Sequence, residues 1–223
     1  MNTLRTLSIV LMAIAAASAA HANLIVNSSF EEGMHTNDGN NTETLSAGAT
    51  DITGWTVVGS HVSWIEVPNP FGLRAIGGIR FLDLTGYTAG APFGGVTQTI
   101  ATVPGLSYTL TFSVGSYTTR WGGPPVVVTG LAGSTIVTQG GVDNPTSFST
   151  WSVTSGDWTA TDTSTVITLV GTAGVNYIGL DDVEVVCLSG PRCPGTGTPE
   201  PSTLALFGLG LAGIGFMGRR RRN

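Results

Sequence analysis

Few residues in this 223-residue chain have the types and spacing that catalysis needs. Apart from His21 near the start, the histidines are His35 and His61, and no serine lies in a Gly-x-Ser-x-Gly turn, so a Ser-His-Asp site has no support. A zinc site lacks histidine ligands. A glycosidase would need two carboxylates at a defined separation, and only the fold sets that separation. We therefore expect a protein that is not an enzyme.

Aromatic residues in loops are the better candidates for chemistry, as binding residues. Tyr117, Arg120 and Trp121 share a segment whose flanking glycines leave the backbone free to carry these side chains outward. Arginine next to aromatic rings suits a hydroxyl-rich ligand such as a sugar. Tyr87 and Phe93 are further loop aromatics. The alternative is that Trp121 folds over the edge of the domain as a structural residue.

The two cysteines, Cys187 and Cys193, have Gly190 and Pro191 between them. In an exported protein an isolated pair at this spacing predicts a local disulfide that closes a turn. Metal binding and free thiols are the alternatives, but a metal needs more ligands than two thiolates.

The first 22 residues have the pattern of a secretory signal peptide. Arg5 provides the positive charge, residues 7–17 are apolar, and Ala20-His21-Ala22 is a small-x-small cleavage site, so we expect cleavage before Asn23. The alternative is an uncleaved membrane anchor, for which the apolar run is short.

The last residues, 199–223, form a three-part tail. Pro199, Glu200 and Pro201 precede an apolar segment, 203–218, that is just long enough to enter a bilayer. Arg219, Arg220, Arg221 and Arg222 would then hold its end on the cytoplasmic side. This order resembles the PEP-CTERM signal of Gram-negative bacteria, which the membrane protease exosortase processes. The resemblance implies secretion, anchoring in the inner membrane before processing, and then the outer surface or the extracellular space.

Between these ends, residues 23–189 are long enough for one domain with a core, and residues 190–198 form a linker of Gly, Pro and Thr. Of the chain's 14 acidic residues only Glu200 lies outside the part from 23 to 198. The chain has no lysine, and an acidic surface of this kind repels phosphate backbones, so we expect no nucleic acid partner. The basic residues of this part are Arg74, Arg80, Arg120 and Arg192.

The region 23–189 shows no helical periodicity. Short runs of β-branched and aromatic residues alternate with Gly, Pro, Asn and Asp, and every second residue is apolar across 106–114. This pattern predicts an all-β fold of two packed sheets, in which Trp55, Trp64, Trp151 and Trp158 are structural. The expected strands are 56–58, 62–67, 79–84, 96–103, 107–114, 126–128, 134–139, 147–153, 166–170 and 175–186.

An opening Asn-x-x-Phe-Glu (Asn27, Phe30, Glu31) and a closing Asp181-Asp182-Val183 bracket this region. The succession resembles the galactose-binding-like jelly rolls of carbohydrate-binding modules and of many exported PEP-CTERM proteins. The resemblance implies a jelly-roll sandwich over nearly the whole domain, flanked by an N-terminal signal helix and a C-terminal transmembrane helix.

Sugar-binding members of that family often hold a structural calcium where the first and last strands meet. The resemblance implies as ligands Glu31 or its neighbour Glu32, with Asp181 or Asp182 and backbone carbonyls, because Ca²⁺ takes about six to eight hard oxygens. The alternative is that these acids are solvated or accept hydrogen bonds from nearby backbone. A further ligand would come from an intervening loop, which offers Asp38, Glu43 and Glu66.

Two functions follow from these observations. The first is a binding module that holds cell-surface or extracellular polysaccharide through Tyr87, Tyr117, Arg120 and Trp121. The second is a structural protein of the envelope or biofilm matrix that has no defined small ligand.

Overall fold

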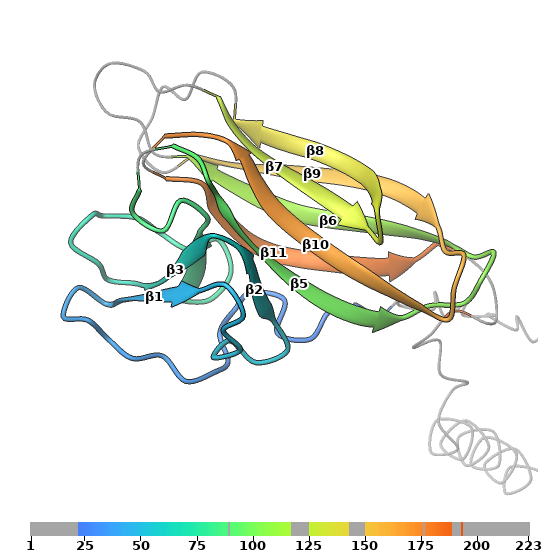
Figure 1. Ribbon diagram of the computed structural model, residues 1–223, viewed down its shortest axis with the longest axis horizontal. Helices are drawn as coiled ribbons and strands as arrows, with labels where there is room; N and C mark the ends of the chain where they lie inside the picture. Colours follow the sequence, from blue (N-terminus) through green and yellow to red (C-terminus); the bar gives the residue numbers. More distant parts are fainter. Residues whose placement is uncertain are drawn as a thin grey trace, which may run out of the picture.

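The computed structural model describes residues 22–88, 90–116, 125–142, 150–175, 177–188 and 193. These residues form eleven strands in two antiparallel sheets that pack face to face (Figure 1). The predicted all-β sandwich is therefore confirmed. The signal peptide and the tail lie outside the described residues, and so does the segment 117–124. Within the described part, no helix has the length and apolar character to cross a membrane.

The larger sheet has six strands in the order β1-β3-β4-β11-β6-β9, and the smaller has five in the order β2-β5-β10-β7-β8. The bounds of the first sheet are β1 (Thr42–Ser46), β3 (His61–Glu66), β4 (Arg80–Asp83), β11 (Gly179–Cys187), β6 (Ser107–Ser116) and β9 (Thr150–Thr159). Those of the second are β2 (Thr56–Gly59), β5 (Gly94–Ala101), β10 (Ser164–Ala173), β7 (Val126–Ala132) and β8 (Thr135–Val142).

The alternating residues of 106–114 belong to β6, and the side chains that point inward from this strand lie in the centre of the core. Leu110 and Phe112 of β6 point between the sheets and are fully buried, whereas Thr109 and Thr111 face outward. On the facing sheet, Gly130 of β7 leaves no room for a side chain, because a Cβ there would lie 2.8 Å from atoms of both Leu110 and Phe112. The large residues of one sheet thus fit against a small one of the other.

Trp55 and Trp64 are buried, as predicted, and both hold the N-terminal segment in place. The indole N–H of Trp55 donates to the carbonyl of Asn27 (3.0 Å), and that of Trp64 donates to the carbonyl of Phe30 (2.9 Å). Asn27 and Phe30 have φ angles of 55° and 58°, so this segment turns sharply. The Asn-x-x-Phe-Glu pattern therefore has a structural role at its first two named positions.

The outer face of the six-stranded sheet carries a second, smaller apolar cluster. Ile65, Phe81 and Tyr177 form it together with Leu73, which comes from the loop between β3 and β4. This loop folds over the outer face and covers one end of the sheet. Trp151 packs edge-on against Phe81, and Trp158 stacks on Tyr108 at 5.3 Å, so both tryptophans are structural.

The predicted strands differ from the observed ones in their bounds and in one edge strand that was missed. The edge strand β1 was not predicted, because its sequence Thr-Glu-Thr-Leu-Ser has few apolar residues. The strand expected at 147–153 is β9, which continues to Thr159, and the run expected from residue 175 begins as β11 at Gly179. Edge strands have one partner only, so their sequences are less constrained by burial.

A disulfide joins Cys187, the last residue of β11, to Cys193, with the two Cα atoms 5.6 Å apart. Both cysteines are buried against the main core. Replacing both by Ala should lower the free energy of unfolding by about 2 kcal/mol, because the bond restrains a short loop in the unfolded chain. Urea unfolding with and without reductant measures this effect. The native chain should lose stability on reduction and the double variant should not; equal stability of the two proteins under oxidising conditions would contradict the expectation.

Candidate functional site

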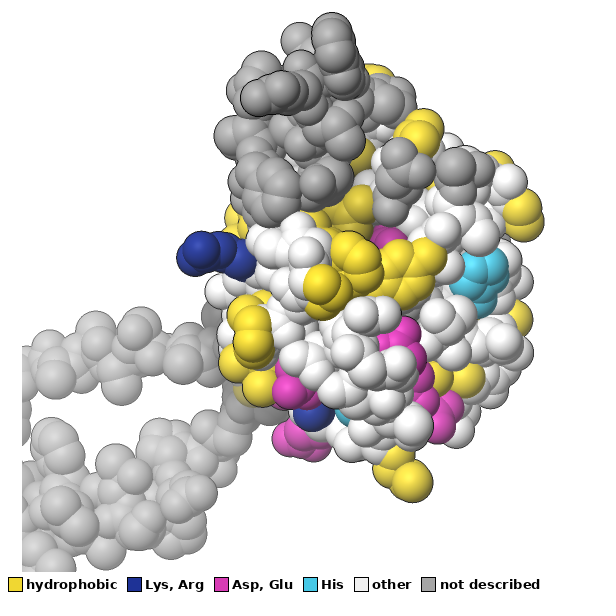
Figure 2. Space-filling model, turned by 90° about the vertical axis from the view of Figure 1, so that its left-hand side faces the viewer, with side chains coloured by type: hydrophobic (Ala, Val, Ile, Leu, Met, Phe, Trp, Pro, Cys, Tyr) yellow, Lys and Arg dark blue, Asp and Glu magenta, His cyan; other side chains and the backbone are white. Residues whose placement is uncertain are grey.

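Two exposed aromatic rings lie together at one end of the sandwich. Phe71 and Tyr87 are 38% and 42% exposed, and their ring centroids are 5.5 Å apart at an interplanar angle of 48°. Burial and the nearby charges of Asp83 and Asp38 raise the pKa of Tyr87 to about 12, so its hydroxyl stays protonated. Figure 2, which looks onto this end of the molecule, shows hydrophobic side chains gathered there. We call Phe71 and Tyr87 the ring pair.

The turn that carries Tyr87 is held by the buried carboxylate of Asp83, the last residue of β4. Its Oδ1 accepts hydrogen bonds from the backbone N–H of Thr85 (2.9 Å) and of Ile178 (3.0 Å), and the hydroxyl of Thr85 donates to the same carboxylate. Burial raises the pKa of Asp83 to about 6 despite these donors. The side chain therefore links the turn to the segment before β11.

The other side of the turn rests on His61 of β3. An imidazole nitrogen, Nε2, bonds the carbonyl of Gly86 at 3.1 Å, while Nδ1 pairs with the hydroxyl of Ser60 at 2.8 Å. A Cβ at Gly86 would clash with the His61 ring, so glycine is required there. Tyr87 itself has a φ of 66°, which is strained for a bulky residue. The surrounding contacts thus hold Tyr87 in a conformation that it would not adopt alone.

Among the residues predicted to bind a ligand, Tyr87 is exposed, and Phe93 is partly buried and packs against the core. Tyr117, Arg120 and Trp121 lie outside the described residues. The strand before them, β6, ends at the same end of the sheet as β4, because Gly115 pairs with Gly179 and Gly179 pairs with Asp83.

Sequence reasoning missed Phe71. It lies in the loop between β3 and β4, where Asn69 holds a turn by bonding both the N–H and the carbonyl of Leu73 at 3.0 Å. The only signal in the sequence is the Pro-Asn-Pro-Phe-Gly run, which indicates a turn with an aromatic residue inside it. Its neighbour in space, Tyr87, is contributed by a different loop.

The acids that the resemblance brought together do converge, on the loop segment 76–80. Glu31 Oε1 accepts the N–H groups of Ile79 (2.9 Å) and Arg80 (2.7 Å), and Asp181 Oδ2 accepts those of Ile76 (2.9 Å) and Gly77 (3.0 Å). The side chains of Asp182 and Glu31 lie against Gly77 and Gly78, where added Cβ atoms would clash with them. The fourth predicted ligand, Glu32, has an exposed side chain.

These residues fit a calcium ion only in part. Asp181 is fully buried and its carboxylate accepts three backbone N–H groups, and burial raises its pKa to about 7. Its oxygens therefore serve the loop. Glu31 and Asp182 each keep one carboxylate oxygen without a hydrogen-bond partner in the described part of the chain. The described residues contain no group of three or more Asp, Glu, His or Cys that could hold a metal, so calcium stays a prediction.

The fold and the tail define the class of protein: a β-sandwich that carries an envelope-sorting signal. Residues 198–222 match the PEP-CTERM protein-sorting motif, which confirms the resemblance of the tail and marks the chain for export. Residues 23–175 match DUF642, a family described as a protein of unknown function, and the chain belongs to this family. The match begins at the expected first residue of the mature chain and ends before β11, which completes the six-stranded sheet.

No curated protein sequence matches this chain. Among solved structures, it is similar to the Stig cyclase Fisc from Fischerella sp. TAU, crystallised in complex with (3Z)-3-(1-methyl-2-pyrrolidinylidene)-3H-indole, with 18% identity and a TM-score of 0.55 over 77% of this chain and 100% of that chain. The CBM22-1 xylan-binding domain from Paenibacillus barcinonensis Xyn10C has 15% identity and a TM-score of 0.44, covering 70% of this chain and 99% of that one. At 18% identity the similarity to Fisc concerns the fold alone.

Asp83 should make stability depend on pH. Its pKa is about 6 in the folded chain against an ordinary 3.8, so the folded state holds the proton more tightly. The free energy of unfolding should therefore fall as pH rises from about 4 to about 6, by about 3 kcal/mol at 1.4 kcal/mol per unit. Asp83→Asn should remove this part of the decline and leave the part that Asp181 contributes.

Urea unfolding of the native and variant chains across pH checks this expectation. Asp51→Asn, which removes an exposed carboxylate, is the matched control and should leave the profile unchanged. Parallel profiles for the native chain and Asp83→Asn would mean that the hydrogen bonds to Asp83 fully offset its burial.

Proposed function

We propose that this chain is a non-catalytic polysaccharide-binding protein of the cell surface or the extracellular matrix, and that the ring pair is its contact with the polymer. The observation that carries the proposal is the ring pair itself: two exposed rings, 5.5 Å apart, of which one is held in a strained backbone conformation by a buried carboxylate. Strain of this kind persists only where the surroundings enforce it, and it gathers at functional positions.

The chemistry of the pair suits a sugar. Aromatic faces pack against the C–H faces of pyranose rings, and the protonated hydroxyl of Tyr87 can donate to or accept from a sugar hydroxyl. The domain has many more acidic than basic residues, which favours a neutral or cationic polymer over an anionic one.

The tail gives the proposed location and partners. The PEP-CTERM motif supports handling by the general secretion machinery and by exosortase, with the predicted segment 203–218 as the membrane anchor. On this proposal the chain passes from the inner membrane to the outer surface or the extracellular space, where the domain meets polysaccharide.

Tyr87→Gly tests the role of the ring pair. Glycine adopts a φ of 66° without strain, which offsets part of the packing lost with the half-buried ring, so the chain should stay folded with only a small change in melting temperature. Binding of cell-surface polysaccharide, measured by affinity electrophoresis, should weaken by up to about tenfold, since one aromatic contact contributes about 0.5–1.5 kcal/mol.

Two controls sharpen this test. Tyr87→Phe keeps the ring and should retain most of the binding, and Ile136→Ala removes an exposed apolar side chain from β8 and should change nothing. Undiminished binding by Tyr87→Gly would reject the ring pair as the contact. A native chain that binds no polysaccharide would favour the structural matrix protein instead.

We also propose that Glu31 and Asp182 hold a structural calcium, with backbone carbonyls as further ligands. If so, a chelator should lower the melting temperature and added calcium should restore it in a concentration-dependent way. Glu31→Gln keeps an oxygen for the N–H groups of Ile79 and Arg80 but loses the charge, so this variant should no longer respond to the chelator. Glu32→Gln is the matched control. Identical melting curves in chelator and in calcium would mean that these acids bind no calcium and serve only as hydrogen-bond acceptors for the loop.

A further inference from the structure

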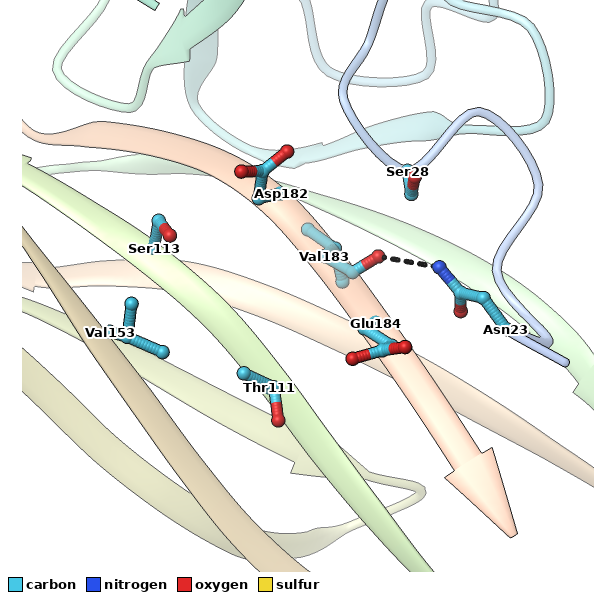
Figure 3. A pocket seen from close by; sticks show the side chains of 8 residues that line it. All are labelled: Asn23, Ser28, Thr111, Ser113, Val153, Asp182, Val183 and Glu184. Atoms are coloured by element: carbon cyan, nitrogen blue, oxygen red, sulfur yellow. Dashed lines mark hydrogen bonds between the residues drawn. The ribbon is translucent and has the colours of Figure 1, made fainter. Parts of the chain in front are cut away.

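A groove of about 360 Å³, whose lining residues are mostly polar, lies on the outer face of the six-stranded sheet. Its floor is formed by Thr111 and Ser113 of β6 and Val153 of β9, and its other side by Asp182 and Glu184 of β11, with Asn23 at the end (Figure 3). The pairing of β11 with β6 shifts register between Asp181 and Glu184, and Asp182 has a φ of 47°. This bulge brings both acidic side chains to the groove.

The groove contains a hydroxyl that no described residue engages. Ser113 is 3% exposed and lines the groove, yet its side chain makes no hydrogen bond in the described part of the chain. A hydroxyl that opens to the groove offers a ligand both a donor and an acceptor. Thr111 lies beside it on the same strand face, so the floor presents two hydroxyls in a row.

The charged side chains of the groove are acidic. Asp182 Oδ1 accepts the hydroxyl of Ser29 at 2.7 Å, which leaves its second oxygen for a ligand, and Glu184 is exposed. None of the residues that line the groove is Lys, Arg or His. Val153, 66% exposed, adds an apolar surface against which the C–H face of a sugar ring can pack.

We propose that this groove binds an amino sugar with a free ammonium group, as one unit of a partly deacetylated polysaccharide. The ammonium pairs with Glu184, the ring hydroxyls bond to Ser113 and Thr111, and the C–H face rests on Val153. The inference shares with the proposed function only the class of polymer, because the ring pair and the groove use different residues.

Binding of two oligosaccharides tests the inference: a β-1,4-linked glucosamine hexamer and its N-acetylated counterpart. The exported chain with its tail, purified in detergent, is titrated with each at mildly acidic pH. The glucosamine hexamer should bind about fivefold more tightly or better, as expected for one solvent-accessible ion pair, and this preference should shrink as salt is added. Equal affinity for the two oligosaccharides, or binding of neither, would overturn the inference. Neutralisation of the groove acids by the amino terminus of the mature chain, at Asn23, would produce equal affinity and would overturn the inference in the same way.

Variants separate the groove from the ring pair. Glu184→Gln should abolish the preference for glucosamine, whereas Asp51→Asn, which removes one exposed charge elsewhere, should not. Ser113→Ala should weaken both hexamers and leave the melting temperature unchanged or higher, because it removes a hydroxyl without a partner. A fall in melting temperature would assign Ser113 a structural role and count against the site.

The ring-pair variant completes the comparison. Tyr87→Gly should leave the ratio of the two affinities unchanged. If Glu184→Gln has no effect while Tyr87→Gly weakens polysaccharide binding, the groove assignment fails and the proposed function stands. The reverse pattern would reject the ring pair and retain the groove.

Discussion

The loops at one end of this sandwich depend on carboxylates that accept backbone N–H groups. Asp83 holds the turn that carries Tyr87, and Glu31 and Asp181 hold the segment 76–80 over the outer face of the sheet. Irregular loops leave N–H groups without the partners that strands provide, and a carboxylate offers several acceptor positions at one point. Both features proposed to bind ligands lie next to loops fixed in this way.

This arrangement has a cost in stability. Burial raises the pKa values of Asp83 and Asp181, which means that the folded chain holds their charges less favourably than water does. An apolar residue at either position would avoid that cost and would leave the loop N–H groups without acceptors. The strained backbone conformation of Tyr87 adds to this cost in stability. Evolution tolerates such costs where they fix the position of a functional group, which is consistent with a role for the end of the sandwich that carries Tyr87.

The sequence predicted what depends on periodicity and burial. The alternation across 106–114 indicated the central strand β6, and the strand-like settings of Trp55 and Trp64 indicated core residues. It did not predict Phe71 as a neighbour of Tyr87, because two irregular loops meet there and neither has a periodic pattern. The acids Glu31, Asp181 and Asp182 were expected to converge, and they do. Their partners are backbone N–H groups of the loop 76–80, and backbone donors leave no trace in residue types.

The direction of β11 relates the ring pair to the tail. This strand starts at Gly179, which pairs with Asp83 at the end that carries the Tyr87 turn, and finishes at Cys187, which pairs with Tyr108 near the start of β6. β11 therefore ends opposite the ring pair, and the Cys187–Cys193 disulfide holds Cys193 against the core (Figure 1). The sorting motif follows β11 in the sequence, so an anchored chain would be attached through the end of the sandwich opposite the ring pair. The groove, bordered by Thr111 and Glu184 between the two ends, would stay open along the side.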